Sequence, residues 1–215
     1  MLHTFFMFNV QSQNPVGAIS GVIDVSPMGA ATYTIPIEVV PGTQGVQPNL
    51  SIVYNSYGDM GLLGMKWNLS GLSAITRCSP SKYYNDPIDA VPISFAVNRF
   101  ALDGERLINI GSSGAIVYST EEERFTRIHP VSNHTSFIAY TDDGSIMKYG
   151  STVNSRQIMK ENTSNTLTWL IDTITDFNGN YMSFKYMKSN NDEEVLIEKI
   201  NYTSNRKSGM QTFLV

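Results

Sequence analysis

Residues 29–56 read GAATYTIPIEVVPGTQGVQPNLSIVYNS and contain two strand patterns separated by turn residues. Side chains in 32–39 alternate between apolar and polar, which predicts a half-buried β-strand. A second alternation from Leu50 to Tyr54 predicts another strand, and the glycines and prolines of 41–49 predict the turn between them. Because Pro36 cannot donate a ladder hydrogen bond, we expect the first strand to be an edge strand or to carry a bulge. The stretch therefore predicts a β-arch or long hairpin.

The composition is that of a folded chain with little charge. Of its 215 residues, 41% are hydrophobic and 16% are charged, and the net charge is −4 with a pI of about 5.3. This length suits one large all-β domain, or one domain and the start of another. The absence of a strong positive charge argues against nucleic acid or an anionic membrane as a partner. No stretch approaches 18 apolar residues, so we expect no transmembrane segment.

Two features of the sequence bear on export and redox state. Cys78 is the single cysteine, so it forms no internal disulfide and cannot build a cysteine-based zinc site alone. The first thirteen residues, MLHTFFMFNVQSQ, have an apolar centre but no Lys or Arg ahead of it. Residues 1–13 are therefore either an N-terminal tail or the remnant of a signal peptide, and the sequence leaves both open.

Three further hairpins are predicted by turn dipeptides between strand patterns, and no segment shows a helical period over a dozen residues. Asp-Gly or Asn-Gly between apolar runs is typical of a type I′ turn, so Gly104, Gly144 and Gly179 should lie in turns. The sequence thus predicts an all-β fold built as an antiparallel meander. The expected strand pairs are Arg99–Leu102 with Arg106–Ile110, Phe137–Tyr140 with Ile146–Tyr149, and Leu167–Thr175 with Tyr181–Tyr186, followed by a strand at Ile197–Tyr202.

The same patterns predict the buried apolar residues. Alternation places one set of large side chains on the core-facing side of each strand, and both tryptophans fall in strand patterns. The residues expected to be buried are Tyr33, Ile35, Ile37, Leu50, Ile52, Tyr54, Trp67 and Trp169.

The stretch 29–56, followed by GLLGMKWNLSGLSAITRC at 61–78, resembles the start of the Salmonella virulence plasmid B protein (SpvB) family. The same module opens the B subunits of insecticidal toxin complexes and many secreted proteins that continue into RHS/YD repeats. Family members usually have Gly-Met-Gly-Trp where this chain has Lys66 before Trp67. If that glycine needs a positive φ, we expect local backbone strain at Lys66.

The resemblance implies a division of the chain and a larger protein. Ile174–Tyr181 is similar to an RHS/YD unit, in which an Asp-x-x-Gly turn precedes a tyrosine. We therefore expect a tail or signal-peptide remnant at 1–13, an SpvB-like β module at 14–155, and the start of an RHS/YD-like sheet at 156–215. The apolar end Phe213–Val215 suggests a fragment whose strands belong to a larger β shell.

Histidine and cysteine residues provide weak candidates for chemistry. His129 and His134 are five residues apart in a segment with turn residues, which favours two solvated loop histidines over a metal or catalytic pair. A Cys-His nucleophile with Cys78 has no local support, and a small thiol packed in the core is the better interpretation.

Acidic segments give two more candidates. Ser119–Glu123 has the composition of the catalytic strand in the actin-modifying ADP-ribosyltransferase domains of some relatives, but those domains are separate and C-terminal. We interpret Glu121–Glu123 as a charged turn that pairs with Arg124 and Arg127. Asp176–Asn180 resembles a calcium loop, but its glycine is fourth rather than sixth, so a hairpin turn fits better. We therefore predict no catalytic, cofactor-binding or metal-binding residues.

The favoured function is a non-catalytic structural module of a secreted toxin-complex or RHS-type bacterial virulence protein, forming part of a β shell that encloses or delivers an effector. Its expected partners are other toxin-complex subunits or the C-terminal remainder of its own chain, and its expected location is extracellular, with cytoplasm before export. An alternative is a surface adhesin or carbohydrate-binding β module using Tyr83 and Tyr84 as an exposed platform. An enzyme would require His129, Glu121 and Cys78 to meet in one pocket.

Overall fold

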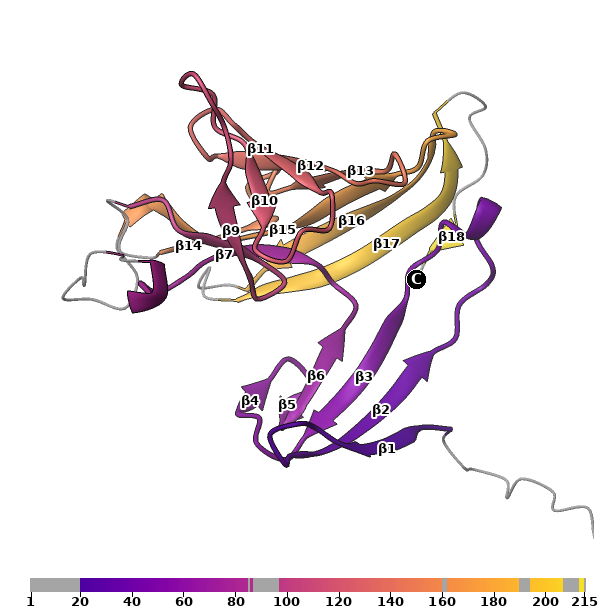
Figure 1. Ribbon diagram of the computed structural model, residues 1–215. Coiled ribbons are helices and arrows are strands. Elements are labelled where there is room, and N and C mark those ends of the chain that lie inside the picture. Colours follow the sequence, from indigo (N-terminus) through magenta and orange to yellow (C-terminus); the bar gives the residue numbers. More distant parts are fainter. Residues whose placement is uncertain are drawn as a thin grey trace, which may run out of the picture. The chain divides into compact units, whose positions relative to one another are not determined.

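The computed structural model of the chain describes residues 20–84, 86, 97–159, 162–189, 194–206 and 213–214. These residues form β-strands and two short 3₁₀ turns, and they contain no α-helix, which confirms the all-β prediction. The chain divides into two compact units (Figure 1). Unit 1 comprises Met1–Ile37 and Ser51–Ser70, and unit 2 comprises Glu38–Leu50 and Gly71–Val215. The predicted tail at 1–13 lies outside the described residues.

Unit 1 is built on a four-stranded sheet in the order β1-β2-β3-β6. The two strands predicted from 29–56 are β2 and β3, and they are neighbours in this sheet. Two short strands, β4 and β5, pair as a hairpin whose turn lies between Gly61 and Gly64. The bounds are β1 Val22–Val25, β2 Ala31–Ile37, β3 Leu50–Asn55, β4 Met60–Gly61, β5 Gly64–Met65 and β6 Trp67–Ser70.

The edge-strand prediction for Pro36 was wrong, because β2 lies between β1 and β3. The proline is tolerated because the pairing of β2 with β1 runs only from Ala31 to Thr34. Pro36 thus lies two residues beyond the last paired position, where its missing N–H leaves no bond of that ladder unmade.

The predicted burial is confirmed for Leu50, which is 5% exposed, and for Trp169, which is 1% exposed. It was wrong for the other predicted core residues, which are only half-buried. Their strands form a single sheet in unit 1, so their apolar face is only partly removed from water. Tyr54 and Trp67, opposite each other on β3 and β6, partly shield one another with ring centroids 5.2 Å apart. The half-buried residues are Tyr33, Ile35, Ile37, Ile52, Tyr54 and Trp67.

The backbone strain expected at Lys66 is confirmed, since its φ is +67°. A lysine side chain disfavours this left-handed conformation, which glycine adopts freely. Lys66→Gly is therefore expected to stabilise the chain by about 0.5–1 kcal/mol. Urea unfolding followed by circular dichroism would measure it. Lys148→Gly is the matched control, because Lys148 lies within strand β13 (Ile146–Tyr149), and glycine there should destabilise the chain.

Unit 2 contains a meander whose strands β7 to β13 pair in sequence order. Its two ends, β7 and β13, both pair with the long strand β15 (Asn162–Thr175). The seven meander strands and β15 therefore form a closed circuit of antiparallel pairs, a closure that the sequence did not predict. The meander strands are β7 Ala74–Arg77, β8 Phe100–Leu102, β9 Glu105–Asn109, β10 Tyr118–Thr120, β11 Arg127–Val131, β12 Ser136–Tyr140 and β13 Ile146–Tyr149.

Strand β15 is the central element of unit 2. Trp169 on β15 lies opposite Arg156 of β14 (Arg156–Met159) on one edge and opposite Ile75 of β7 on the other. Beyond the circuit, the sheet continues through the predicted third hairpin to β16 (Asn180–Lys188), β17 (Val195–Asn205) and β18 (Phe213–Leu214), and Figure 1 shows β15, β16 and β17 as long, curved neighbours.

All three predicted hairpins form, and Gly104, Gly144 and Gly179 lie in their turns with positive φ. In the first hairpin both Asp103 and Gly104 have positive φ (50° and 86°), which agrees with a type I′ turn. The other two differ from that prediction. In each of them three residues lie between the two residues that close the turn. Thr141 N–H donates to the Ser145 carbonyl, and Asp176 N–H donates to the Asn180 carbonyl.

A 3₁₀ turn at Thr43–Gly45 is bound to the third hairpin within unit 2. The Gln44 Oε1 atom accepts hydrogen bonds from the side-chain amides of Asn178 (2.8 Å) and Asn180 (2.9 Å). Asn180 is buried, and its amide also donates to Asp176. These bonds attach the segment 38–50, which runs between the two stretches of unit 1, to the body of unit 2.

Gln44→Ala is expected to lower the free energy of unfolding by about 1–2 kcal/mol, because two amide donors lose their shared acceptor. Hydrogen exchange should show faster exchange in residues 42–46. Gln157→Ala, in strand β14, serves as the matched control and should leave the exchange of that segment unchanged. Wild-type exchange rates in Gln44→Ala would contradict the proposed attachment.

Candidate functional site

An aromatic cluster occupies the interior of the closed circuit in unit 2. The ring of Phe100 is 5.1 Å from Phe137, 5.4 Å from Trp169 and 5.7 Å from Tyr118, in edge-to-face arrangements. All four residues are at most 5% exposed. The Arg77 guanidinium lies 5.2 Å from the Phe100 ring centroid, a cation–π distance. These five residues come from five different strands, so their packing holds the strands of the circuit together.

His134 belongs to this cluster, so the prediction that it is a solvated loop histidine was wrong. It is 7% exposed, its ring stacks on Phe100 at 5.1 Å, and its Nε2 is 2.9 Å from the Tyr118 hydroxyl oxygen. The turn between β11 and β12 explains this position. Ser132, Asn133 and His134 all have positive φ (47°, 55° and 65°), and this left-handed run turns the imidazole inward.

The environment of His134 favours the neutral imidazole. Burial, reinforced by the positive charge of Arg77, holds the pKa of His134 below its ordinary value. Burial also raises the pKa of Tyr118, although Arg77 opposes that shift. Both partners in the hydrogen bond are therefore uncharged near neutral pH, as expected of a group that supports packing.

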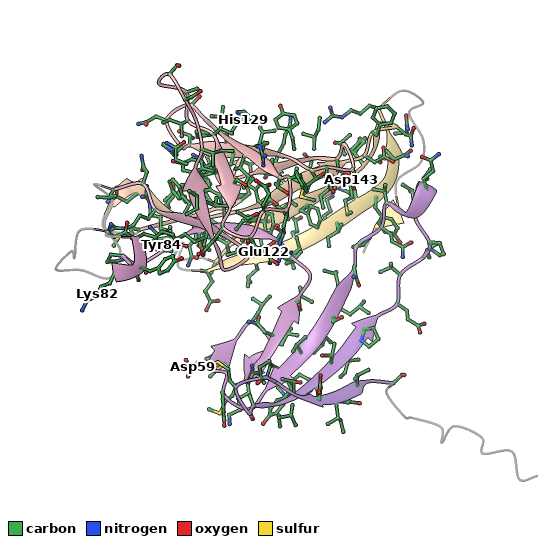
Figure 2. The ribbon with its side chains drawn as sticks, viewed as in Figure 1. Asp59, Lys82, Tyr84, Glu122, His129 and Asp143 are labelled. Atoms are coloured by element: carbon green, nitrogen blue, oxygen red, sulfur yellow. The ribbon has the colours of Figure 1, made fainter. Side chains whose placement is uncertain are left out.

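The other candidates do not join His134. His129 is on β11, half-buried, and its ring contacts Tyr140 at 5.6 Å. Cys78 is half-buried rather than fully in the core, and burial raises the pKa of its thiol, so the reactive thiolate is disfavoured. Figure 2 shows His129, Glu122 and Tyr84 at separate places on unit 2.

Glu121–Glu123 is an exposed charged turn, as predicted. Arg124 pairs with Glu122 at 3.0 Å, and Arg127 pairs with Glu123 at 2.9 Å, which confirms the expected ion pairs. The Arg127 guanidinium and the Phe125 N–H hold the pKa of the Glu123 carboxyl below its ordinary value. The Glu122 and Glu123 carboxylates therefore make contacts within the turn. Exposed ion pairs such as these contribute little to the free energy of unfolding.

The Asp176–Asn180 segment is a hairpin turn, as predicted. The Asp176 carboxylate accepts hydrogen bonds from the backbone N–H of Asn180 and from its side-chain amide, both at 2.7 Å. Its oxygens are thus occupied by donors within the turn. Among the residues that the structure describes, no group of three or more His, Cys, Asp or Glu is placed to hold a metal ion.

Tyr83 and Tyr84 do not form the flat exposed platform that carbohydrate binding would use. Tyr83 is 82% exposed, but Tyr84 is only partly exposed and its ring lies 4.3 Å from the Arg106 guanidinium. The two rings meet edge to face at 4.9 Å. The neighbouring Glu121 carboxylate raises the pKa of Tyr84 to about 12. This 3₁₀ turn, Lys82–Tyr84, is thus packed through Tyr84 onto strand β9.

Sequence reasoning missed the aromatic cluster as a unit, because its members are far apart in the chain. One local signal was available: Asn133 readily adopts a positive φ, so Ser-Asn-His between two strands could have indicated a left-handed turn. The cluster is packed and largely apolar, and His134 and Tyr118 form a hydrogen-bonded polar pair within it. In the described part of the chain, no helix has the length and apolar character needed to span a bilayer.

Comparison with known protein structures shows the same fold in toxin proteins. The Photorhabdus luminescens Tc holotoxin pore (TccC3-D651A mutant) has a TM-score of 0.65 at 18% identity over 94% of this chain and 11% of that one. The TcdB2-TccC3 crystal structure gives 0.63 at 18% identity over 92% and 11%. The N-terminal domain of the effector SpvB from Salmonella typhimurium strain LT2 gives 0.60 at 20% identity over 82% and 67%.

The chain spans about a tenth of the length of the toxin-complex chains that it resembles. A comparison with curated proteins gave no match. The family model for Salmonella virulence plasmid 65kDa B protein matches residues 25–90 and 116–214, which together exceed half of the chain. The match includes strands of unit 1 and six of the eight strands of the unit 2 circuit, with β8 and β9 outside it. The chain therefore belongs to the Salmonella virulence plasmid 65kDa B protein family.

Proposed function

We propose that the chain is a non-catalytic structural module of a secreted bacterial virulence protein of the toxin-complex or RHS type. It forms part of a β shell that encloses or delivers an effector. The observation that carries this proposal is the coverage of the fold matches. Nearly the whole chain matches toxin-complex structures, yet it accounts for only 11% of their chains. A module of this kind works as one part of a much larger assembly.

The geometry of unit 2 supports a structural role. Its circuit of antiparallel strands is filled by a buried aromatic cluster, and the sheet extends outward through β16, β17 and β18. In the described residues, β18 is the last strand of that sheet. An unpaired strand edge favours continuation by further strands. The partners that we propose are the C-terminal remainder of a longer chain or other toxin-complex subunits.

The candidate chemical groups also support a role without catalysis. His134 and Tyr118 are buried as a neutral pair, the Cys78 thiol is disfavoured as a nucleophile, and Glu123 holds a turn. Enzyme sites bring such groups together with their pKa values shifted toward the working pH. Here the pKa values of the His134 imidazole and the Cys78 thiol move away from it. The proposal also divides the chain into an SpvB-like β module at 14–155 and the start of an RHS/YD-like sheet at 156–215.

The test is protection of cargo in the complete polypeptide. The full reading frame, with its C-terminal segment, is purified and treated with proteinase K, and intact C-terminal segment is followed by mass spectrometry. A shell predicts that this segment is digested much more slowly than the same segment made alone. Equal digestion rates in a polypeptide that is otherwise folded would overturn the proposal.

A further inference from the structure

The hairpin of β4 and β5 presents apolar side chains to water. Met60 and Met65 lie opposite each other and are 74% and 67% exposed. Leu62 and Leu63, between the two strands, are 43% and 48% exposed. Exposed hairpin turns usually carry polar residues or turn formers. Four large apolar side chains in six residues are not explained by the packing of unit 1.

Two further apolar residues of unit 1 are also exposed. Tyr57 is 69% exposed and Met28 is 82% exposed. The Tyr57 hydroxyl lies close to Gly29, because a Cβ atom added at Gly29 would be 3.5 Å from the hydroxyl oxygen. The turn that carries Met28 therefore lies beside Tyr57. We name the six residues the apolar tip: Met28, Tyr57, Met60, Leu62, Leu63 and Met65. Figure 2 labels Asp59, which directly precedes the hairpin at this end of unit 1.

The hairpin that carries the apolar tip is held in place. Lys66 N–H donates to the Asp59 carbonyl at 2.8 Å, and Asn55 N–H donates to the Lys66 carbonyl at 2.9 Å. Gly61 packs directly on β6, where a Cβ would overlap the Trp67 carbonyl oxygen. The backbone thus fixes the hairpin while its large side chains stay in water. Several large exposed apolar side chains on one hairpin and the turns before it mark a binding site for a protein or a membrane.

The local charges favour a protein partner. Residues 57–66 contain one acidic and one basic residue, Asp59 and Lys66, so this surface has no basic excess to attract anionic lipids. Half of the apolar tip is methionine, whose flexible side chain adapts to the shape of a protein groove. Most of each similar toxin-complex chain lies outside the region that this chain matches, and a domain of the same chain is present at high effective concentration.

We propose that the apolar tip docks into a groove lined by aliphatic and aromatic side chains on a later domain of the same, longer polypeptide. This inference rests on the proposed shell function and names one contact that joins this module to the rest of the shell. The groove needs few charged side chains, because Asp59 and Lys66 are the charged residues of the segment 57–66.

The test uses methionine oxidation in the complete polypeptide. Hydrogen peroxide converts exposed methionines to sulfoxides, and mass spectrometry gives the rate at Met28, Met60 and Met65. Docking predicts that these three oxidise about tenfold or more slowly than in the same polypeptide unfolded in urea. Rates equal to those of the unfolded polypeptide would overturn the inference.

Paired variants show whether the tip itself makes the contact. Leu62→Ser with Leu63→Ser should restore rapid oxidation of Met60 and Met65. Val22→Ser with Val25→Ser is the matched control, since both valines are 65% exposed on β1 of the same sheet, and it should leave protection intact. Protection that survives the leucine variant contradicts the inference.

Two other occupants are distinguished by the same measurement. If protection increases with protein concentration, the tip binds a second copy of the chain. If protection appears only with phosphatidylcholine–phosphatidylglycerol vesicles, the tip binds a membrane. Either result overturns the inference. The proteinase K assay is run on the same sample. A protected C-terminal segment with exposed tip methionines would refute this contact and leave the shell function standing.

Discussion

Trp169→Ala is expected to lower the free energy of unfolding by about 3–5 kcal/mol. The indole is 1% exposed and contacts Phe100 and Phe137 at ring-centroid distances of 5.4 and 5.1 Å. Its Nε1–H donates to the Thr135 carbonyl at 3.1 Å. Alanine would leave a cavity that the surrounding rigid rings do not fill. It would also leave the Thr135 carbonyl without its hydrogen-bond donor. Urea unfolding followed by far-ultraviolet circular dichroism measures the loss.

Trp67→Ala is the matched control for this effect. Trp67 is half-buried on the single sheet of unit 1, so its truncation removes less packing and should cost about 1–2 kcal/mol. Equal losses for the two variants would contradict the placement of the main core in the circuit of unit 2.

The second large effect is loss of stability in mild acid caused by His134. Burial and Arg77 lower the pKa of His134 in the folded chain, while the unfolded chain has the ordinary value of about 6.5. The unfolded state therefore binds the proton first as the pH falls. The stabilisation by neutral His134 is complete above about pH 6.5 and is lost progressively below it, by about 1.4 kcal/mol for each unit of difference between the two pKa values.

The groups around His134 leave the added charge uncompensated. The neighbours that can ionise are Tyr118 on β10, whose hydroxyl contacts Nε2, and Arg77 on β7, which repels a second positive charge. The remaining contacts, Phe100 and Phe137, are neutral rings. Protonation would thus favour release of the strained turn at Ser132–His134 from the cluster.

The measurement is the free energy of unfolding of wild type and two variants at about pH 7 and pH 5, a window that lies above the ordinary carboxyl pKa values of about 3.9 for Asp and about 4.3 for Glu. His134→Gln should be less stable at pH 7 but should lose less on acidification, because its side chain does not ionise. His129→Gln is the matched control and should retain the wild-type loss. A wild-type acid response in His134→Gln would refute the assignment.

Local features of the fold could be predicted well from the sequence. Asp103-Gly104, Asp143-Gly144 and Asn178-Gly179 determine three turns through their own backbone preferences, and the alternating residues beside them form the strands that pair. Lys66 could be predicted as strained because its neighbours match a family pattern that has glycine there. Each of these predictions depends on a few adjacent residues.

Features that depend on distant residues could not be predicted. The closure of the circuit joins Ile75 to Trp169, and no local pattern specifies that pairing. His134 looked like a solvated loop residue because its burial depends on contacts with Phe100 and Tyr118, which lie on the distant strands β8 and β10. Tyr33 and Ile35 have the pattern of a core face, but alternation identifies only an apolar side and not whether a second layer covers it.

The central claim is that this chain forms part of the wall of a larger shell. Cryo-electron microscopy of the complete polypeptide tests it most directly. The account predicts that the sheet of β15, β16 and β17 continues into later strands and that these close around an internal cavity holding the C-terminal segment. A reconstruction in which residues 20–214 form an isolated domain, with no strand added beyond β18 and no enclosed cavity, would contradict it.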